Sequence, residues 1–375
     1  MFKIYMVLLC TSYSLLFAGI LDFEKYIKQE ISHKKPPSAS FSILKGSKIV
    51  YTKSIGYTDK NMNHLSTNKS VYHVYSLTKI LTMSLVMKLV EKGKIGLHDS
   101  ITKYFPYFDL RYKGKKVDIT ILNLLNHSSG IGDSSKEVRT MMGDFKSDVY
   151  QKLSFLPGSE AKYSSAEYII LGKLVEKVTG EDFETLIQKY ILDPSRMKRS
   201  AFTYTETIEK NQVHGTVQFF SIVGTVMRFM LADTSKDEYE GCMLWLNSFS
   251  IAWQPAGGLI ASIDDMAKFM SAYHKNKLFT QKTKRLIYKE KSVPVHSWIS
   301  TQDDVEFGIG WYHIRDKGKL FYQHQGVGPG FRTIIRIYPK YDITIIILTS
   351  QTSVDIDDWA DKLIDDIVIN NTLAL

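Results

Sequence analysis

The stretch from residue 71 to residue 92, VYHVYSLTKILTMSLVMKLVEK, constrains the fold of this chain most. An apolar and aromatic run, Val71 to Tyr75, leads into a serine, after which apolar residues recur with helical spacing. The pattern predicts a buried helix with Ser76 at its start. Because residues three apart share a helix face, the amine of Lys79 can reach the Ser76 hydroxyl. Unpaired N–H groups at a helix start also favour negative charge that develops there.

The spacing of serine and lysine does not by itself select Ser76. Ser-x-x-Lys occurs seven times in the chain, at Ser32, Ser42, Ser66, Ser76, Ser100, Ser159 and Ser195. Only the copy at Ser76 opens a long apolar helix, whose low-dielectric surroundings make a lysine amine a usable base. The alternative is that Ser76 caps the helix and Lys79 extends to water.

The first 18 residues differ in character from the rest of the chain. Lys3 precedes an uncharged, mostly apolar run from Ile4 to Phe17, and the small residue Ala18 follows. Such a run is short for a bilayer span and fits the core of a signal peptide. We expect an exported protein, periplasmic or secreted, cleaved after Ala18 to leave residues 19–375. The alternative is a retained anchor.

Charge and cysteine content narrow the kinds of partner. Cys242 is the only cysteine beyond the first 18 residues, so no internal disulfide is expected. The net charge is +9, and seven Lys or Arg between residues 274 and 291 oppose one Glu. This run could contact an anionic envelope or polymer, although a solvated face is the more ordinary explanation. No metal, nucleotide or phosphate-binding motif is present, so we expect no cofactor and no nucleic-acid partner.

The order of expected elements predicts the fold class. Helices are expected at 21–31, 120–125, 168–178, 184–191, 219–231, 264–273 and 359–369, and strands at 40–44, 48–56, 307–314, 320–323, 331–338 and 343–349. Strands at both ends with helices between them predict an α/β chain of the α+β type with one antiparallel sheet.

The same order predicts two lobes. Residues 19–93 and 300–375 would form the α/β lobe, residues 94–299 a mainly helical inserted lobe, and the groove between them the site. The amphipathic helix at 219–231 is expected to pack on its own domain, with a lid or a membrane-contacting surface as the alternative.

Three short motifs carry a family resemblance: Ser76-Leu77-Thr78-Lys79, Tyr163-Ser164-Ser165 and His324-Gln325-Gly326. In this order they resemble the motifs of the serine β-lactamase and penicillin-binding-protein superfamily, specifically the class C β-lactamase-like group with its esterases and D-amino-acid peptidases. The resemblance covers nearly the whole chain after residue 18. Stretches that resemble recurring family sequences lie at 40–59, 124–131, 156–180, 255–262 and 307–310.

The resemblance assigns roles to individual residues. It implies that Ser76 is the acylated nucleophile and that Lys79 takes or relays its proton. Tyr163 would share the base role, which a phenol can do only where an adjacent cation stabilises the phenolate. Lys79 and Tyr163 are therefore expected to titrate as a coupled pair. Gly326 would let a substrate backbone approach, and the N–H of Val327 would join that of Ser76 in an oxyanion hole.

The chain departs from the family pattern at two positions. Ser165 stands where the second motif usually ends in asparagine. The resemblance implies that it contacts the substrate, but its shorter side chain cannot supply the same amide contact to a substrate carbonyl or to the lysine. His324 stands where β-lactamases usually carry lysine, and a mostly neutral histidine does not clamp a substrate carboxylate. We therefore expect an ester or D-amino-acid amide substrate rather than efficient β-lactam hydrolysis. His127 is expected to fix its loop by hydrogen bonding.

Three functional hypotheses follow from these residues. The first is an exported serine hydrolase, without a cofactor, that acts on a small molecule or peptide through an acyl-enzyme on Ser76. The second is a D-alanyl-D-alanine carboxypeptidase or weak β-lactamase acting on cell-wall peptides. The third is a catalytically inactive binding module, which Ser165 suggests, although retention of Lys79, Tyr163 and His324 argues against it. The sequence makes no prediction of oligomeric state.

Overall fold

The computed structural model describes residues 18–31, 36–132, 150–218, 236–290, 292–295 and 304–372. Most of the expected signal segment, residues 1–17, and the helix expected at 219–231 lie outside these ranges. Among the described helices, none combines the length and the apolar character that crossing a bilayer requires.

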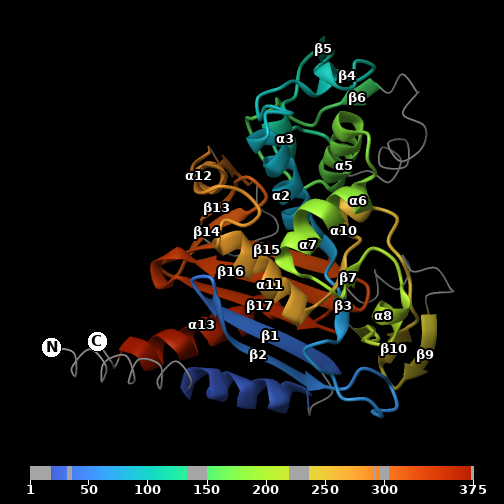
Figure 1. Ribbon diagram of the computed structural model, residues 1–375, viewed down its shortest axis with the longest axis vertical. Helices are drawn as coiled ribbons and strands as arrows, with labels where there is room; N and C mark the ends of the chain where they lie inside the picture. Colours follow the sequence, from blue (N-terminus) through green and yellow to red (C-terminus); the bar gives the residue numbers. More distant parts are fainter. Residues whose placement is uncertain are drawn as a thin grey trace.

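One antiparallel sheet is built from both ends of the chain (Figure 1). Its strand order is β12-β13-β14-β15-β16-β17-β1-β2 in the described residues. The strands are β1 Ser38–Lys45, β2 Lys48–Gly56, β12 Val293–Pro294, β13 Asp304–Phe307, β14 Tyr312–Asp316, β15 Lys319–Gly328, β16 Phe331–Tyr338 and β17 Ile343–Thr349. Strand β17 pairs with β1 from Ala39 opposite Thr349 to Lys45 opposite Ile343. The α+β fold class and the sheet formed by the two termini are confirmed.

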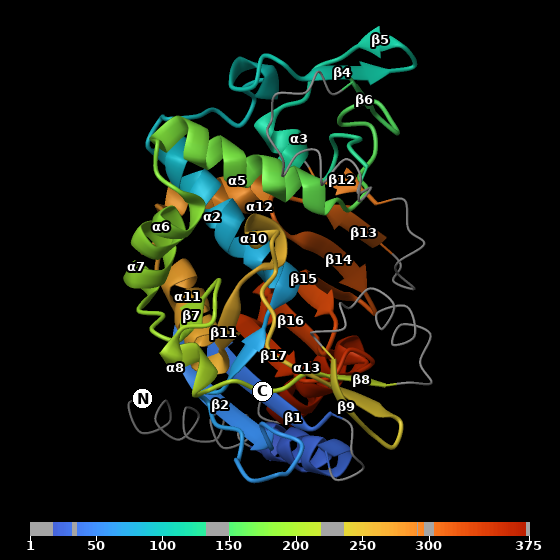
Figure 2. The same ribbon diagram turned by 90° about the vertical axis from the view of Figure 1, so that its right-hand side faces the viewer.

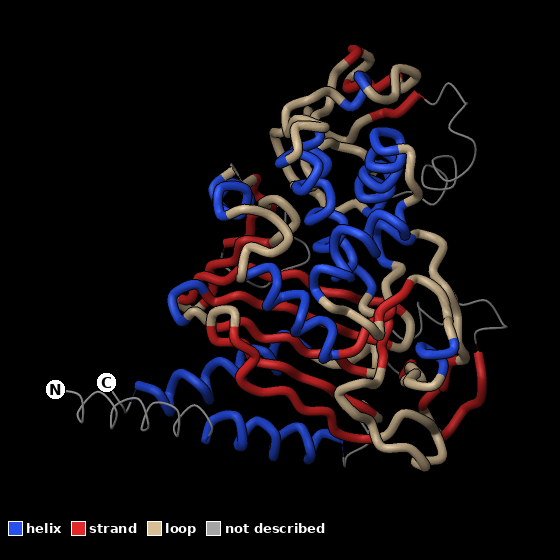
Figure 3. Tube along the Cα trace, in the orientation of Figure 1, coloured by secondary structure: helices blue, strands red, loops and turns tan. Residues whose placement is uncertain are grey.

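Both faces of the sheet are covered by helices, as Figure 3 shows. Alternation along the strands divides the apolar side chains between two cores. On β17, Ile345 and Ile347 pack in the core that includes the helix over residues 18–31 and α13, Ile356–Thr372. Ile346 and Leu348 pack in the second core, which includes α2, Thr78–Glu91.

Helix α2 lies at the centre of the molecule, beside α5, Ser165–Thr179, and the short α10, Gln254–Gly257 (Figure 2). It is apolar around most of its circumference, and nearly all of its residues are buried. A 3-10 turn, Tyr75–Leu77, precedes α2 and contacts β15. The predicted buried helix therefore begins where β15, an inner strand of the sheet, passes.

The remaining elements lie on and around the sheet and α2. The helices are α3 Ile121–Leu125, α6 Phe183–Ile187, α7 Asp193–Ser195, α8 Glu206–Glu209, α11 Ile263–His274 and α12 Gln281–Lys289. The short strands are β3 Val71–His73, β4 Asp109–Tyr112, β5 Lys115–Lys116, β6 Tyr150–Lys152, β7 Ser200–Ala201, β8 Thr216–Gln218, β9 Lys236–Glu240, β10 Met243–Leu246 and β11 Ile260–Ser262. They make three small sheets, β8-β10-β9, β3-β11-β7 and β5-β4-β6.

Two features differ from the sequence-based expectation. The single strand expected at 307–314 is divided into β13 and β14, because Gly310 has a φ of +72° and turns the chain. A Cβ at Gly310 would lie 2.8 Å from the Met83 side chain, so this turn packs against α2. Helix α11 comes from the stretch assigned to the helical lobe, 94–299, yet it packs on β1 and β17. The lobe boundaries themselves stay a prediction.

Candidate active site

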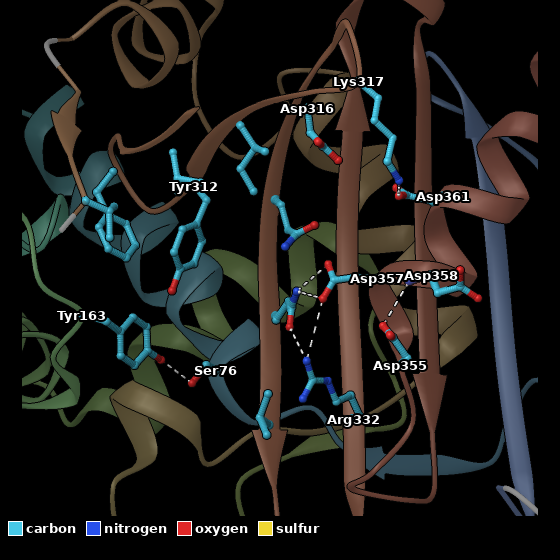
Figure 4. A pocket seen from close by; sticks show the side chains of 17 residues that line it. Ser76, Tyr163, Tyr312, Asp316, Lys317, Arg332, Asp355, Asp357, Asp358 and Asp361 are labelled. Atoms are coloured by element: carbon cyan, nitrogen blue, oxygen red, sulfur yellow. Dashed lines mark hydrogen bonds and ion pairs between the residues drawn. The ribbon is translucent and has the colours of Figure 1, made fainter. Parts of the chain in front are cut away.

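A cavity of about 670 Å³ lies beside the turn that carries Ser76, between Tyr163 and the strands of the large sheet (Figure 4). Ser76 and Tyr163 border one end of it, and strands β13 to β16 and the start of α13 form the rest. Its lining is Ser76, Tyr163, Val295, Val305, Phe307, Tyr312, Ile314, Asp316, Lys317, Gln323, Gln325, Val327, Arg332, Asp355, Asp357, Asp358 and Asp361. The nucleophile expected from the sequence therefore faces a space large enough for a small molecule or a peptide segment.

The backbone just before Ser76 is held in an uncommon conformation. Tyr75 has a φ of +46°, a region that costs a non-glycine residue about 1–3 kcal/mol. Its hydroxyl donates to the Pro329 carbonyl at 2.5 Å, and its ring lies so close to Gly328 that a Cβ there would sit 2.3 Å away. The surrounding packing therefore fixes the turn that presents Ser76.

Lys79 and Tyr163 converge on the Ser76 hydroxyl. The Lys79 Nζ atom lies 3.2 Å from Ser76 Oγ, and the Tyr163 hydroxyl lies 2.5 Å from the same oxygen. Lys79 is fully buried, and its Nζ also donates to the Ala256 carbonyl at 2.6 Å. Nζ stands 4.8 Å from the centre of the Tyr163 ring, within cation–π range. The alternative in which Lys79 extends to water is excluded by this burial.

Ser165 lies behind these groups rather than on the cavity wall. Its hydroxyl, at the first residue of α5, accepts from Lys79 Nζ at 3.4 Å. The shorter side chain thus still reaches the lysine, at the long end of hydrogen-bond distances. Ser165 does not line the cavity, so its expected contact with substrate stays a prediction.

His324 lies on β15 between the rings of Tyr163 and Tyr312, whose centroids are 6.4 and 5.7 Å from its own. It is buried, and its Nδ1 contacts the Gln325 carbonyl at 2.9 Å. Burial, together with the positive charge of Lys79, lowers the pKa of His324 to about 3. The imidazole is therefore neutral at physiological pH, with its proton on the nitrogen that donates to the carbonyl.

Gly326 and Val327 follow His324 where β15 passes the turn at Ser76. Val327 lines the cavity, whereas a Cβ at Gly326 would lie 2.0 Å from the Val74 carbonyl oxygen. The close approach of β15 to the Ser76 turn therefore requires glycine at 326. The oxyanion role of the Val327 N–H stays a prediction.

Replacing Gly326 with alanine is expected to lower kcat/KM by about 10²-fold, because an ångström of displacement at the site costs that much. The new Cβ would push β15 away from Val74 and thus away from Ser76. Steady-state kinetics and thermal unfolding measure the effect. Gly318→Ala is the control: unlike Gly326, Gly318 has a positive φ of +71°, which strains an added Cβ, but nothing lies within 4 Å of that atom, so kcat/KM should stay unchanged. Equal losses in the two variants would contradict the argument.

Two groups of residues at the site were missed by sequence reasoning. The first is Glu167, a fully buried carboxylate in α5 that binds His127 and Ser129. The sequence signal that could have found Glu167 is that it is the only acidic residue in the otherwise apolar stretch AEYIILG, residues 166–172. The Nδ1 atom of His127 lies 2.5 Å from Glu167 in α5, so this histidine links its loop to that helix, and its role in fixing the loop stays a prediction.

The second missed group is the polar wall, formed by Gln325, Arg332, Arg336 and Asp357. The Gln325 amide nitrogen donates to both carboxylate oxygens of Asp357 at 2.7 and 2.6 Å, and its carbonyl accepts from Arg332 at 3.1 Å. Arg336 is buried and donates to Asp357 at 2.5 Å. No sequence signal joined residue 357 to residue 325, because the link exists only once α13 packs beside β16.

Acidification is expected to destabilise the protein, because three histidines near the site are buried and neutral. Burial lowers the pKa of His73 to about 4 and that of His324 to about 3, and it holds the pKa of His127 well below its ordinary value. Unfolded histidine binds a proton near pH 6.5, so below that pH protons favour the unfolded chain. Each such histidine then costs up to about 1.4 kcal/mol per pH unit until its folded pKa is reached.

Thermal unfolding between pH 7.5 and pH 5 measures this loss. We expect Tm to fall steadily below pH 6.5, and His73→Phe to flatten the fall. A Tm that is unchanged over this range would contradict the buried neutral histidines.

In the described residues, no group of three or more His, Cys, Asp or Glu is arranged to hold a metal ion.

The sheet, the helices that cover it and the contacts of Ser76 with Lys79 and Tyr163 define the serine β-lactamase and penicillin-binding-protein superfamily. Within it, the family model described as Beta-lactamase matches residues 23–366, so the chain belongs to this family.

Known relatives and solved structures agree with this assignment. Protein flp of Staphylococcus aureus (strain MW2) is 24% identical over 351 residues, which cover 92% of this chain. The chain spans 65% of the length of that relative. The octameric penicillin-binding protein homologue from Pyrococcus abyssi is 24% identical with a TM-score of 0.75, over 93% of this chain and 77% of its own. D-amino acid amidase from Ochrobactrum anthropi SV3 is 18% identical with a TM-score of 0.75. The match covers 94% of this chain and 99% of the amidase chain. These two structures share the fold.

Proposed function

We propose that this protein is an exported serine hydrolase that forms an acyl-enzyme on Ser76 and acts on an ester or a D-amino-acid amide. The observation that carries the proposal is the convergence of Lys79 Nζ and the Tyr163 hydroxyl on Ser76 Oγ at the cavity. A serine hydroxyl needs an adjacent base to become a nucleophile, and these two groups are within its reach.

The proposed reaction has two steps. Ser76 Oγ attacks the substrate carbonyl carbon, and its proton passes to the Lys79–Tyr163 pair. The bond to the alcohol or amine then breaks, the leaving group takes the proton from Tyr163, and the acyl group stays on Ser76. In the second step Tyr163 accepts a proton from water, which attacks the ester carbon and releases the acid. Tyr163 then returns a proton to Ser76 Oγ.

The charges around the cavity favour a substrate without a carboxylate at the reacting end. His324 is neutral, so it supplies no cation where related β-lactamases carry lysine. The two cations on the cavity wall already lie against carboxylates, Lys317 beside Asp361 at 3.1 Å and Arg332 beside Asp357 at 3.8 Å. A substrate carboxylate would therefore compete with these partners, whereas an ester or amide would not.

The other side of the cavity favours an apolar acyl group or side chain. Val305, Phe307, Tyr312 and Ile314 line the cavity, and the Phe307 ring lies 6.3 Å from that of Tyr163. Burial of apolar surface there would contribute about 25 cal/mol per Å² to binding before the ordering costs. The substrate we propose thus combines an apolar acyl part with a neutral leaving group.

A D-alanyl-D-alanine carboxypeptidase or weak β-lactamase is the second candidate. The observation in its favour is the likeness to the penicillin-binding protein homologue from Pyrococcus abyssi. An inactive binding module is the third.

Four reagents applied to the purified protein separate these candidates. We expect turnover of short-chain p-nitrophenyl esters or of D-amino-acid amides, with no labelling by a fluorescent penicillin. Penicillin labelling that Ser76→Ala abolishes, without ester turnover, would establish the carboxypeptidase or β-lactamase. Absence of turnover, of penicillin labelling and of a fluorophosphonate adduct would leave the binding module.

A further inference from the structure

A buried carboxylate lies behind the proposed catalytic groups, in the first turn of α5. Glu167 is fully buried, and three donors reach it. The Ser129 hydroxyl donates at 2.5 Å, the Ser129 backbone N–H at 3.3 Å, and His127 Nδ1 lies 2.5 Å away. Several donors on two oxygens stabilise the ionised carboxylate, as does the helix N-terminus. Glu167 therefore places a negative charge in the interior.

The histidine that holds Glu167 is itself neutral. Burial, followed by the charge of Lys79, lowers the pKa of His127 well below its ordinary value. The Ser164 N–H also points toward Nδ1, at 3.3 Å, but the shorter contact to Glu167 places the imidazole proton on that nitrogen. His127 and Glu167 together therefore carry one net negative charge.

This charge lies one ring away from the groups that contact Ser76. The His127 ring lies 4.8 Å from that of Tyr163 and 5.2 Å from that of Tyr168. Lys79 Nζ stands 5.6 Å from the centre of the same Tyr168 ring. Burial, followed by the charge of Glu167, raises the pKa of Tyr168, and burial, followed by the charge of Lys79, lowers the pKa of His127. The two charges therefore act on the same small group of buried rings.

Lys79 needs such a charge, because its direct partners are neutral. In the described part of the chain its Nζ contacts the Ala256 carbonyl and the hydroxyls of Ser76 and Ser165, and no carboxylate within ion-pair distance. An isolated buried ammonium costs several kcal/mol of desolvation, which an opposite charge in a low dielectric partly offsets.

We propose that Glu167 is a positioning residue that acts through His127, holding the ring beside Tyr163 and supplying the buried negative charge that balances the Lys79 ammonium. The proposal rests on the proposed function, because it concerns the same pair of proton carriers. It also explains how the site works with serine at position 165. The lysine keeps a weak hydroxyl contact there and obtains electrostatic support two residues further along α5.

The charge has a measurable consequence for the pH profile. A nearby negative charge favours protonated forms, so its removal lowers the pH at which the Lys79–Tyr163 pair gives up a proton. The titratable groups that face this pair and Glu167 are Lys79 on α2, His127, Tyr163, Tyr168 on α5, Tyr312 on β14 and His324 on β15. Both histidines are already neutral near pH 7, so they do not titrate in the range that matters.

The test is the pH dependence of the rate at which a fluorophosphonate labels Ser76 in the full chain. In Glu167→Gln we expect both limbs of the profile to move to lower pH by about one unit, which is the size of a charge effect across a few rings. Glu167→Asp keeps the charge and should keep the wild-type midpoints even if its plateau is lower. Glu181→Gln removes an exposed carboxylate paired with Lys189, and should change nothing.

The outcomes separate this inference from the proposed function. Labelling of wild-type Ser76 with unchanged midpoints in Glu167→Gln would overturn the role of Glu167 and leave the hydrolase standing. Absence of labelling in the wild type would overturn the hydrolase first, and with it this role. If Glu167→Gln does not fold, midpoints in Glu167→Asp that are shifted to lower pH would also contradict the inference.

Discussion

Replacing Ser76 with alanine is expected to abolish acylation, because it removes the oxygen that forms the covalent bond. Losing the nucleophile removes the pathway itself, whereas losing a general base only slows it. Intact-protein mass spectrometry after incubation with a fluorophosphonate measures the result. The wild type should gain the mass of one adduct and the variant none.

The fold should tolerate this change, since Ser76 borders the cavity and its hydroxyl is used by Lys79 and Tyr163 alone among the described residues. Ser159→Ala is the matched control. It removes the serine of another Ser-x-x-Lys copy, one that is exposed and hydrogen-bonds to the Leu156 carbonyl. An adduct that persists in Ser76→Ala would show that another residue is the nucleophile.

Replacing Tyr163 with phenylalanine is expected to lower turnover by about 10²- to 10⁴-fold, the range of general acid–base catalysis. The change deletes the hydroxyl that lies 2.5 Å from Ser76 Oγ and keeps the ring that packs on His127 and Phe307. Pre-steady-state kinetics with a p-nitrophenyl ester would separate acylation from deacylation.

Circular dichroism and thermal unfolding should show the Tyr163→Phe variant folded. Tyr322→Phe removes a phenol from the same strand as His324, away from the cavity lining, and should leave turnover unchanged. Unchanged turnover in Tyr163→Phe would refute its role as proton carrier.

Where local pattern and tertiary packing agree, the sequence predicted the structure closely. Strands β16 and β17 begin and end at the expected residues, because their apolar and β-branched side chains alternate between two buried faces. The helix after Ser76 was predictable because its apolar residues recur with helical spacing, and the structure buries nearly all of them. The Ser76, Lys79 and Tyr163 motifs then met as the resemblance implied.

The parts that escaped prediction depend on contacts between distant residues. The division of strand 307–314 reflects the packing of the Gly310 turn on Met83 from α2, which no pattern within the strand indicates. The same holds for Glu167, whose partners lie 38 and 40 residues earlier in the chain. A buried charge is recognised from its donors, and those are brought together only by the fold.

The pairing of β17 with β1 has a consequence for how the protein is made. The two strands are separated by about 300 residues, so a very long loop must close before their hydrogen bonds form. The central sheet can therefore be completed only after almost the entire polypeptide has left the ribosome. A chain with this contact order is expected to fold slowly, which would suit the export that we propose for it.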